Sequence, residues 1–338
     1  MVYQKVLGQL LEDARHAIEV TDEELDEARR RRRLLAGAMR GAFPGSTIYF
    51  NGSVAHGDAN TPLTDVDLGA KLSVEDAKGY GPGRRNALPL MERARQAIRS
   101  ELGEEFPDLT VKIEGQRRAV LVRFGDPVTP GQPDFTADVM TAIPHPSGMG
   151  LYIPNMEISD RWDRADPLTH TKLVLKALED TDRVFARTVR LLKHWNKKHS
   201  KPLCSWNIKA LALECIKEPM PLIDALEGFF THADEALKDG PTKDPAHVAG
   251  PIPLNMLRGD VRRRLRTARD YLKLAQEHEA EGRPLSAQRA LSRVLPEIVP
   301  DVDVTDEEQG RIRSLFSMAA AVGPGLAYGA TPTRAWAP

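Results

Sequence analysis

The hydrophobic periodicity of this 338-residue chain changes twice, and these changes limit its fold more than any other feature. Residues up to about 43 have the apolar spacing of helices, residues 46–143 alternate in the manner of strands, and helical spacing returns from residue 166. The segments that favour strands are 46–50, 65–72, 110–114, 119–124 and 135–143, with a helix favoured at 87–102. We therefore expect an α+β fold, with a mixed sheet followed by a helical C-terminal domain.

Local signals divide the chain further. Thr21 followed by Glu24 is a capping box that starts a helix, and Gly115 begins the turn of a hairpin between two β-type runs. Pro/Gly-rich residues 144–154 indicate a connection to the helical part. We expect a ligand in the cleft between the two domains. The predicted division is N-terminal helices at 1–43, a catalytic domain at 44–155, a helical domain at 156–322 and a flexible tail at 323–338.

The helical part is predicted from apolar residues that recur on one face. A periodic stretch from 166 to about 199 indicates a long helical segment, and its apolar face comprises Leu173, Ala177, Leu178, Phe185, Val189, Leu192 and Trp195. The helical pattern continues through residues 203–216, 222–236 and 260–280.

Composition excludes several classes of protein. No apolar run approaches the roughly 20 residues of a membrane helix, and the first residues lack a secretory signal, so we expect a cytoplasmic protein without membrane contact. A net charge of −1 argues against a surface built to grip long nucleic acid. Cys204 and Cys215 lie in a segment that is helical and apolar, and we expect two buried, unpaired thiols rather than a disulfide or a zinc site.

Five consecutive arginines, residues 29–33, point all round a helix and cannot form one binding stripe. We expect a solvated face with Glu–Arg pairs along the helix. The alternative is that one of these arginines lines the mouth of a phosphate site.

The segment with most chemical information is residues 50–68. A strand runs into Gly52 and Ser53, a loop follows, and the chain returns as a strand that carries Asp65 and Asp67. Alternate residues of a strand share a face, so the two carboxylates are expected to reach into one volume. Paired hard oxygen ligands suit Mg²⁺, which also binds substrate phosphates. Gly52 permits close approach of the backbone to a phosphate, and Ser53 offers a hydroxyl and an N–H group.

A third acid is expected on the strand at 135–143. Asp138 lies within it and Asp134 comes just before it, and on an unbroken strand the two would point to the same side. Either one, together with Asp65 and Asp67, would complete the carboxylate set of a two-metal site. His56 and Asp58 lie in the loop nearby, and His56 is a further candidate for ligand contact.

Together these motifs resemble the DNA polymerase β-like nucleotidyltransferases. The pattern of Gly-Ser, a loop, Asp-x-Asp and a distant single Asp is similar to the branch that holds oligoadenylate synthase, cyclic GMP–AMP synthase and the bacterial cyclic-oligonucleotide synthases called CD-NTases. The sequence AspValMetThrAla resembles the branch's Asp-Val-x-Pro-Ala, which favours Asp138 over Asp134. Further motifs of the branch are similar to LeuLeuLysHisTrpAsn at 191–196 and LeuCysSerTrpAsn at 203–207. The resemblance covers residues from about 20 to 280.

The resemblance implies specific roles for residues of this chain. Asp65, Asp67 and Asp138 would be the catalytic residues and would hold two Mg²⁺ ions, with Mn²⁺ as a substitute. The nucleotide would be bound by Gly52, Ser53, Lys193, Ser205 and Trp206, with Trp206 stacking on a base.

The activity implied is synthesis of cyclic di- or trinucleotides from nucleoside triphosphates, in antiphage signalling. Since no long basic groove is evident, activation by long nucleic acid is not expected, and a regulatory protein partner is an open alternative. The second reading is a CCA-adding or other RNA-end nucleotidyltransferase, for which the near-neutral charge is less suitable. The third is an inactive nucleotide-binding protein, which three retained acids disfavour.

Overall fold

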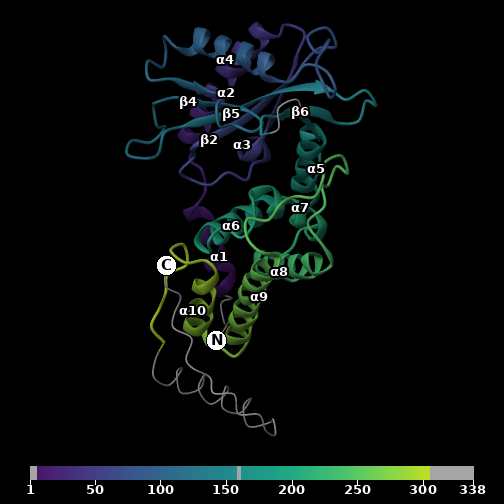
Figure 1. Cartoon of the computed structure of the whole chain (residues 1–338). Coiled ribbons are helices and arrows are strands. Elements are labelled where there is room, and N and C mark those ends of the chain that lie inside the picture. The colour runs from purple at the N-terminus through teal and green to yellow at the C-terminus, as the bar shows by residue number, and fades with distance from the viewer. Residues whose placement is uncertain (1–5, 158–160, 305–338) are drawn as a thin grey trace.

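A computed structural model describes residues 6–157 and 161–304 of the chain. A sheet-containing lobe lies above a helical lobe, and α5 leads from one to the other (Figure 1). The strands are β1 (Thr47–Asn51), β2 (Asp65–Lys71), β3 (Thr110–Lys112), β4 (Val120–Arg123), β5 (Thr136–Pro144), β6 (Leu151–Asn155) and β7 (Arg161–Ala165). The helices are α1 (Val6–Ala17), α2 (Asp22–Ala42), α3 (Gly52–His56), α4 (Leu88–Leu102), α5 (Pro167–Asp180), α6 (Val184–Lys198), α7 (Ser205–Cys215), α8 (Leu222–Asp239), α9 (Arg258–Ala280) and α10 (Pro284–Val294).

Within the described ranges the strands form one mixed sheet of seven strands. Its main path has the order β1-β2-β5-β4-β3. The pair β2–β5 is parallel, and every other neighbouring pair is antiparallel. The alternating apolar residues of these strands face a buried core, since Val66, Leu68 and Val139 are each 1% exposed or less. The α+β fold with a mixed sheet is therefore confirmed.

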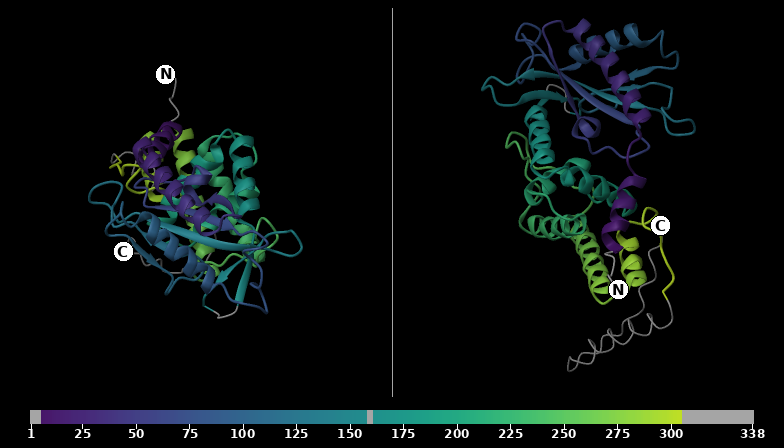
Figure 2. Two further views of the ribbon diagram at one scale, coloured as in Figure 1. Left: turned by 90° about the horizontal axis from the view of Figure 1, so that it is seen from above. Right: turned by 180° about the vertical axis from the view of Figure 1, so that it is seen from behind.

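Helices α2 and α4 cover the face of the sheet that points away from the helical lobe (Figures 1 and 2). The predicted capping box starts α2, because Thr21 accepts the backbone N–H of Glu24 and the Glu24 carboxylate accepts that of Thr21. The preceding helix α1 packs on the helical lobe instead. Its apolar residues, among them Leu7 and Leu11, belong to the hydrophobic core of that lobe.

The predicted long helical segment at 166–199 is two helices, α5 and α6. Asp182 and Arg183 between them have left-handed φ values of 47° and 63°. Thr181 stabilises the break, because its hydroxyl donates to the Ala177 carbonyl at 2.6 Å and accepts the Phe185 N–H at 3.1 Å. The apolar residues of both helices still face one core, so the periodic pattern was preserved across the break.

Two strands lie where the sequence indicated none. β6 overlaps the end of the Pro/Gly-rich residues 144–154, and β7 follows it. The two strands pair with each other, and β6 continues the sheet from the end of β5. Their shortness and the proline in β6 hide the period-two pattern. The predicted tail at 323–338 lies outside the described residues.

The arginine run at 29–33 is only partly the solvated face that was expected. Arg29 and Arg30 pair with Asp26 and Glu27 along the helix. Arg31, however, is 2% exposed and lies over the rings of Phe106, Phe124 and Phe135. The expectation was wrong for this residue because its guanidinium also pairs with Glu27 and Asp126, which lets a charge be buried.

Both cysteines are free, as expected, but each is only half-buried. Cys204 begins α7, and its sulfur accepts the N–H of Asn207 at 3.4 Å. In residues 6–157 and 161–304 we find no helix whose length and apolar character would let it span a bilayer.

Candidate active site

The three predicted acids lie on two adjacent parallel strands. Asp67 on β2 stands directly opposite Asp138 on β5, and Asp65 lies two residues earlier on the same face of β2. Asp65 and Asp138 are exposed and Asp67 is half-buried. The parallel pairing thus brings together carboxylates that are 71 positions apart in the chain, the separation of Asp67 and Asp138.

These carboxylates repel one another. Burial, followed by the neighbouring charges of Asp65 and Asp138, raises the pKa of Asp67 to about 7. The pKa of Asp138 is raised as well, first by desolvation of its carboxyl group and then by Asp65. A cation placed between the carboxylates would remove this repulsion.

The donor set fits Mg²⁺ in chemistry, because it consists of carboxylate oxygens on a rigid sheet. Among the residues that the structure describes, no group of three or more His, Cys, Asp or Glu side chains already has the arrangement that holds a metal ion. The three acids therefore lie near one another and repel one another, but their side chains do not form a preformed metal site.

Gly52 stands directly against the Asp67 side chain. It has φ of +73°, and a Cβ atom at this position would overlap the Asp67 carboxylate. Asn51, the residue before it, pairs with Asp67 across β1 and β2. The short helix α3 then starts at Gly52 and Ser53, so both residues lie beside the acids.

A cavity of about 620 Å³ extends from these residues into the helical lobe. From the sheet lobe it is lined by Gly52, Ser53, Asp65 and Asp67, and from the helical lobe by residues that include Lys193, Ser205 and Lys209. Thus six of the eight predicted site residues line one cavity, and Asp138 adjoins it through its pairing with Asp67.

Beneath the cavity, one buried carboxylate joins two lysines. Asp58 is fully buried, and its Oδ1 accepts Lys193 Nζ at 2.6 Å. Its Oδ2 lies 2.9 Å from Lys209 Nζ, and the Lys209 side chain is 5% exposed. Burial alone would raise the pKa of Asp58, but the two ammonium groups hold it below its usual range. Two cations against one anion leave a net positive charge below the three acids.

His56 completes this buried group. Burial, followed by the charge of Lys209, lowers its pKa to about 3, so its ring is neutral. Lys209 Nζ lies 2.8 Å from its Nδ1, which therefore accepts, and this leaves Nε2 to donate to Thr171 Oγ1 at 3.1 Å. His56 thus connects α3 with α5 and α7, and it does not line the cavity.

Lys209 was not predicted as a site residue, and Asp58 was noted only as an acid in the loop near the candidate site. The available signal was Lys209 itself, a lysine among apolar residues in a segment predicted to be a buried helix. A buried ammonium requires a buried anion, and Asp58, which follows Gly52 and Ser53 closely in the chain, was a candidate.

Two further candidates lie elsewhere. Trp206 is not in the cavity that holds the acids; its ring lies 4.4 Å from that of His170 and lines a neighbouring groove. Asp134 precedes β5 and accepts the backbone N–H of Asp126 at 3.2 Å, so it is not paired with Asp67 as Asp138 is.

No protein-family model matches the chain, and no curated protein matches it in sequence. Solved structures do share its fold. CdnC of E. coli MS115-1, in a complex with HORMA-deltaN, matches with a TM-score of 0.62 and 16% identity, over 88% of this chain and 98% of that one.

Two structures of the Vibrio cholerae cyclic AMP-GMP synthase DncV match in the same way. The complex with the linear intermediate pppA(3′,5′)pG has a TM-score of 0.64 and 12% identity, over 85% of this chain and 94% of that one. The GTP-bound form has a TM-score of 0.65 and 11% identity, over 84% and 92%. The expected resemblance to the bacterial CD-NTases is therefore confirmed for the fold.

Proposed function

We propose that this chain is a metal-dependent nucleotidyltransferase that joins nucleoside triphosphates into a cyclic di- or trinucleotide. The observation that carries the proposal is the pairing of Asp67 with Asp138 on parallel strands, with Asp65 on the same face, beside a cavity whose lining includes four lysines, residues 193, 197, 201 and 209. Acids on one wall and ammonium groups on the other suit a triphosphate with its divalent cations.

Each residue has a role that follows from its place. Asp65, Asp67 and Asp138 would hold two Mg²⁺ ions, or Mn²⁺ in their stead. Gly52 and Ser53 would bind the β- and γ-phosphates through backbone N–H groups and the serine hydroxyl at the start of α3. From the opposite wall, Lys193 and Ser205 would contact the same triphosphate. Trp206 lies outside this cavity, so we assign it no contact with the phosphates.

In the reaction, a ribose hydroxyl oxygen attacks the α-phosphorus, the bond to the β-phosphate oxygen breaks, and pyrophosphate and a proton leave. The bound metal ions would supply Lewis acidity at the hydroxyl and at the leaving phosphates. The chain itself positions both reactants in the cavity between the lobes, and the buried lysines offset the negative charge of the leaving group.

Structural relatives support the type of product. DncV is a cyclic AMP-GMP synthase that has been captured with a linear intermediate, and CdnC forms a complex with HORMA-deltaN. We extend to this chain the synthesis of a cyclic nucleotide, a role in antiphage signalling, and control by a regulatory protein. Because its proposed substrates are cytoplasmic metabolites, the proposal also implies a cytoplasmic enzyme.

The test is incubation of the protein with all four labelled nucleoside triphosphates and Mg²⁺, followed by phosphatase. A phosphatase-resistant product without added RNA is expected, and the same reaction with Asp67→Asn should give none. Label found only on added tRNA would support RNA-end addition instead. Binding of triphosphate without any product, under every metal and partner condition tried, would support an inactive nucleotide-binding protein.

A further inference from the structure

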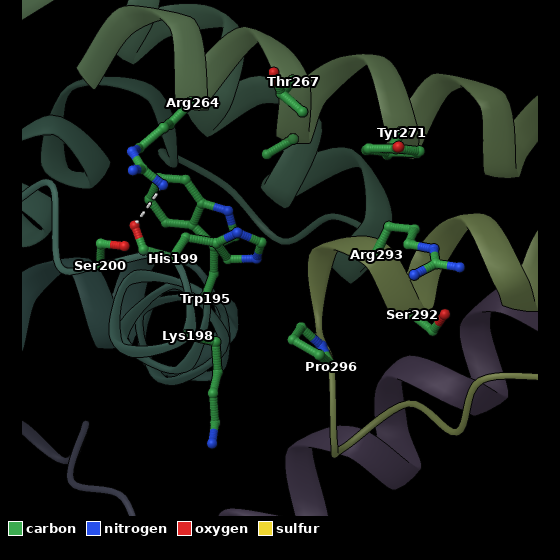
Figure 3. A pocket seen from close by; sticks show the side chains of 11 residues that line it. Trp195, Lys198, His199, Ser200, Arg264, Thr267, Tyr271, Ser292, Arg293 and Pro296 are labelled. Carbon is green, nitrogen blue, oxygen red and sulfur yellow. Dashed lines mark hydrogen bonds between the residues drawn. The ribbon is translucent and has the colours of Figure 1, made fainter. Parts of the chain in front are cut away.

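A second cavity, of about 350 Å³, lies entirely within the helical lobe. Figure 3 shows it between α6, α9 and α10. Its walls are residues 195 and 198–200 from α6 and the turn after it, residues 264, 267, 268 and 271 from α9, and residues 292, 293 and 296 from α10 and its end.

The C-terminal turn of α6 separates this cavity from the proposed active site. Lys193 and Lys197 on one face of the turn line the active-site cavity, whereas Trp195 and Lys198 line the second cavity. In the turn that follows, Ser200 faces the second cavity and Lys201 faces the first. The second cavity is therefore a separate compartment and not an extension of the triphosphate site.

The charges of the second cavity favour an anion. Lys198, Arg264 and Arg293 line it, and among the described residues its lining includes no Asp or Glu. Lys198 pairs with Glu297 and Arg293 with Asp301; both acids lie outside the cavity lining, and their side chains are 66% and 58% exposed. Arg264 donates to the His199 carbonyl oxygen at 3.0 Å. The Arg293–Asp301 separation is 3.5 Å, and exposed pairs of this kind contribute little and yield readily to a better anion.

Aromatic side chains line part of the same cavity and offer flat surfaces for a planar ring. His199 stacks on the buried Trp195 with ring centres 5.6 Å apart, and Tyr271 lies on α9 across from Arg293 on α10 (Figure 3). Burial lowers the pKa of His199, and its Nε2 lies 3.1 Å from the Val294 carbonyl oxygen. The imidazole is thus a neutral, fixed surface that leaves Nδ1 free to accept a hydrogen bond.

We propose that this second cavity binds a phosphorylated planar heterocycle of the size of a nucleoside monophosphate. The phosphate would lie between Arg264 and Arg293, and the ring would lie against His199 and Tyr271. A cavity of about 350 Å³ is at the lower end of the range for ligand sites, roughly 300–1,000 Å³, which suits one nucleotide rather than two. This inference does not depend on catalysis by the chain.

The experiment is calorimetric titration of the full chain with AMP, adenosine and inorganic phosphate. AMP is expected to saturate one site. Adenosine and phosphate should each bind there at least tenfold more weakly, because adenosine lacks the phosphate and inorganic phosphate lacks the ring. Arg293→Glu should weaken AMP binding at least tenfold. Arg289→Glu, one helical turn earlier on α10 and outside the cavity lining, should leave it unchanged.

Lys193→Ala separates the second cavity from the active-site cavity. AMP binding that persists in this variant and is lost in Arg293→Glu supports the proposal, whether or not the chain has enzymatic activity. Absence of saturable AMP binding, equal binding by Arg293→Glu and the original chain, or loss of binding in Lys193→Ala would each overturn it. Cooperative urea unfolding establishes that each variant is folded; the midpoints of the two arginine variants should match the original chain, and that of Lys193→Ala should be lower because Asp58 loses one of its two cations.

Discussion

The buried pairs of Asp58 with Lys193 and Lys209 give the sharpest quantitative prediction. Asp58→Asn keeps the size of the side chain but removes the charge that neutralises two ammonium groups. The Lys209 side chain is 5% exposed, so water cannot replace the lost carboxylate. Removing one partner of a buried ion pair costs about 3–5 kcal/mol, and we expect the free energy of unfolding to fall by that amount.

A double-mutant cycle separates this coupling from general damage. Lys209→Met should cost less than Asp58→Asn, because Asp58 retains Lys193 at 2.6 Å. The double variant should be more stable than the sum of the single costs predicts, by about 2 kcal/mol. Urea unfolding followed by circular dichroism measures each term, and Asp180→Asn, which removes an exposed pair with Lys176, is the matched control. Single costs that simply add would refute the reasoning.

Three further predictions concern other parts of the molecule. Gly52→Ala should abolish turnover, because the new methyl group would overlap Asp67; full activity in a folded variant would contradict this. The contribution of His56 to the free energy of unfolding should fall by about 1.4 kcal/mol between pH 7.5 and 5.5, since the unfolded ring gains a proton near 6.5 while the folded ring resists until about 3. Asp67, whose pKa is raised to about 7, titrates over the same range in the opposite sense, so the effect is measured as the difference in free energy of unfolding between the original chain and His56→Gln; a difference that does not change with pH would exclude it. Arg31→Met should cost about 2–3 kcal/mol, through lost ring and carboxylate contacts, and Arg29→Met should leave the urea midpoint nearly unchanged; equal effects would contradict burial of Arg31 as the cause.

Local sequence signals predicted most of the helices and strands, because a cap or an alternating pattern does not depend on residues far away in the chain. The capping box of Thr21 and Glu24 starts α2 wherever the helix packs. The alternation around Asp65 and Asp67 identifies β2, since one face must be apolar to cover the core. By contrast, β6 has five residues that include a proline, which leaves too few positions for an alternation to show.

The acids of the candidate site could be identified from sequence, but their register could not. Spacing places Asp65 and Asp67 on one face of a strand. That Asp138 stands opposite Asp67 depends on parallel pairing of two segments far apart in the chain. The same holds for Asp58 and Lys193, which are 135 positions apart and meet only when the lobes come together.

Residue type alone misled for one residue. Arginine is usually solvated, yet Arg31 is buried because three rings and two carboxylates surround it. These partners come from distant segments, which a local pattern does not include. The base contact that the resemblance implies for Trp206 stays a prediction; in the structure its ring lies 4.4 Å from that of His170.

In the proposed reaction, Asp65, Asp67 and Asp138 act together on a bound triphosphate. The most direct test is the rate of pyrophosphate release with Mg²⁺ for the original chain and for Asp65→Asn, Asp67→Asn, Asp138→Asn and Asp134→Asn. Each of the first three substitutions should reduce the rate at least a hundredfold with the fold intact, and Asp134→Asn should leave it near the original. Pyrophosphate release that survives Asp67→Asn, or that is lost with Asp134→Asn and retained with Asp138→Asn, would contradict the central claim.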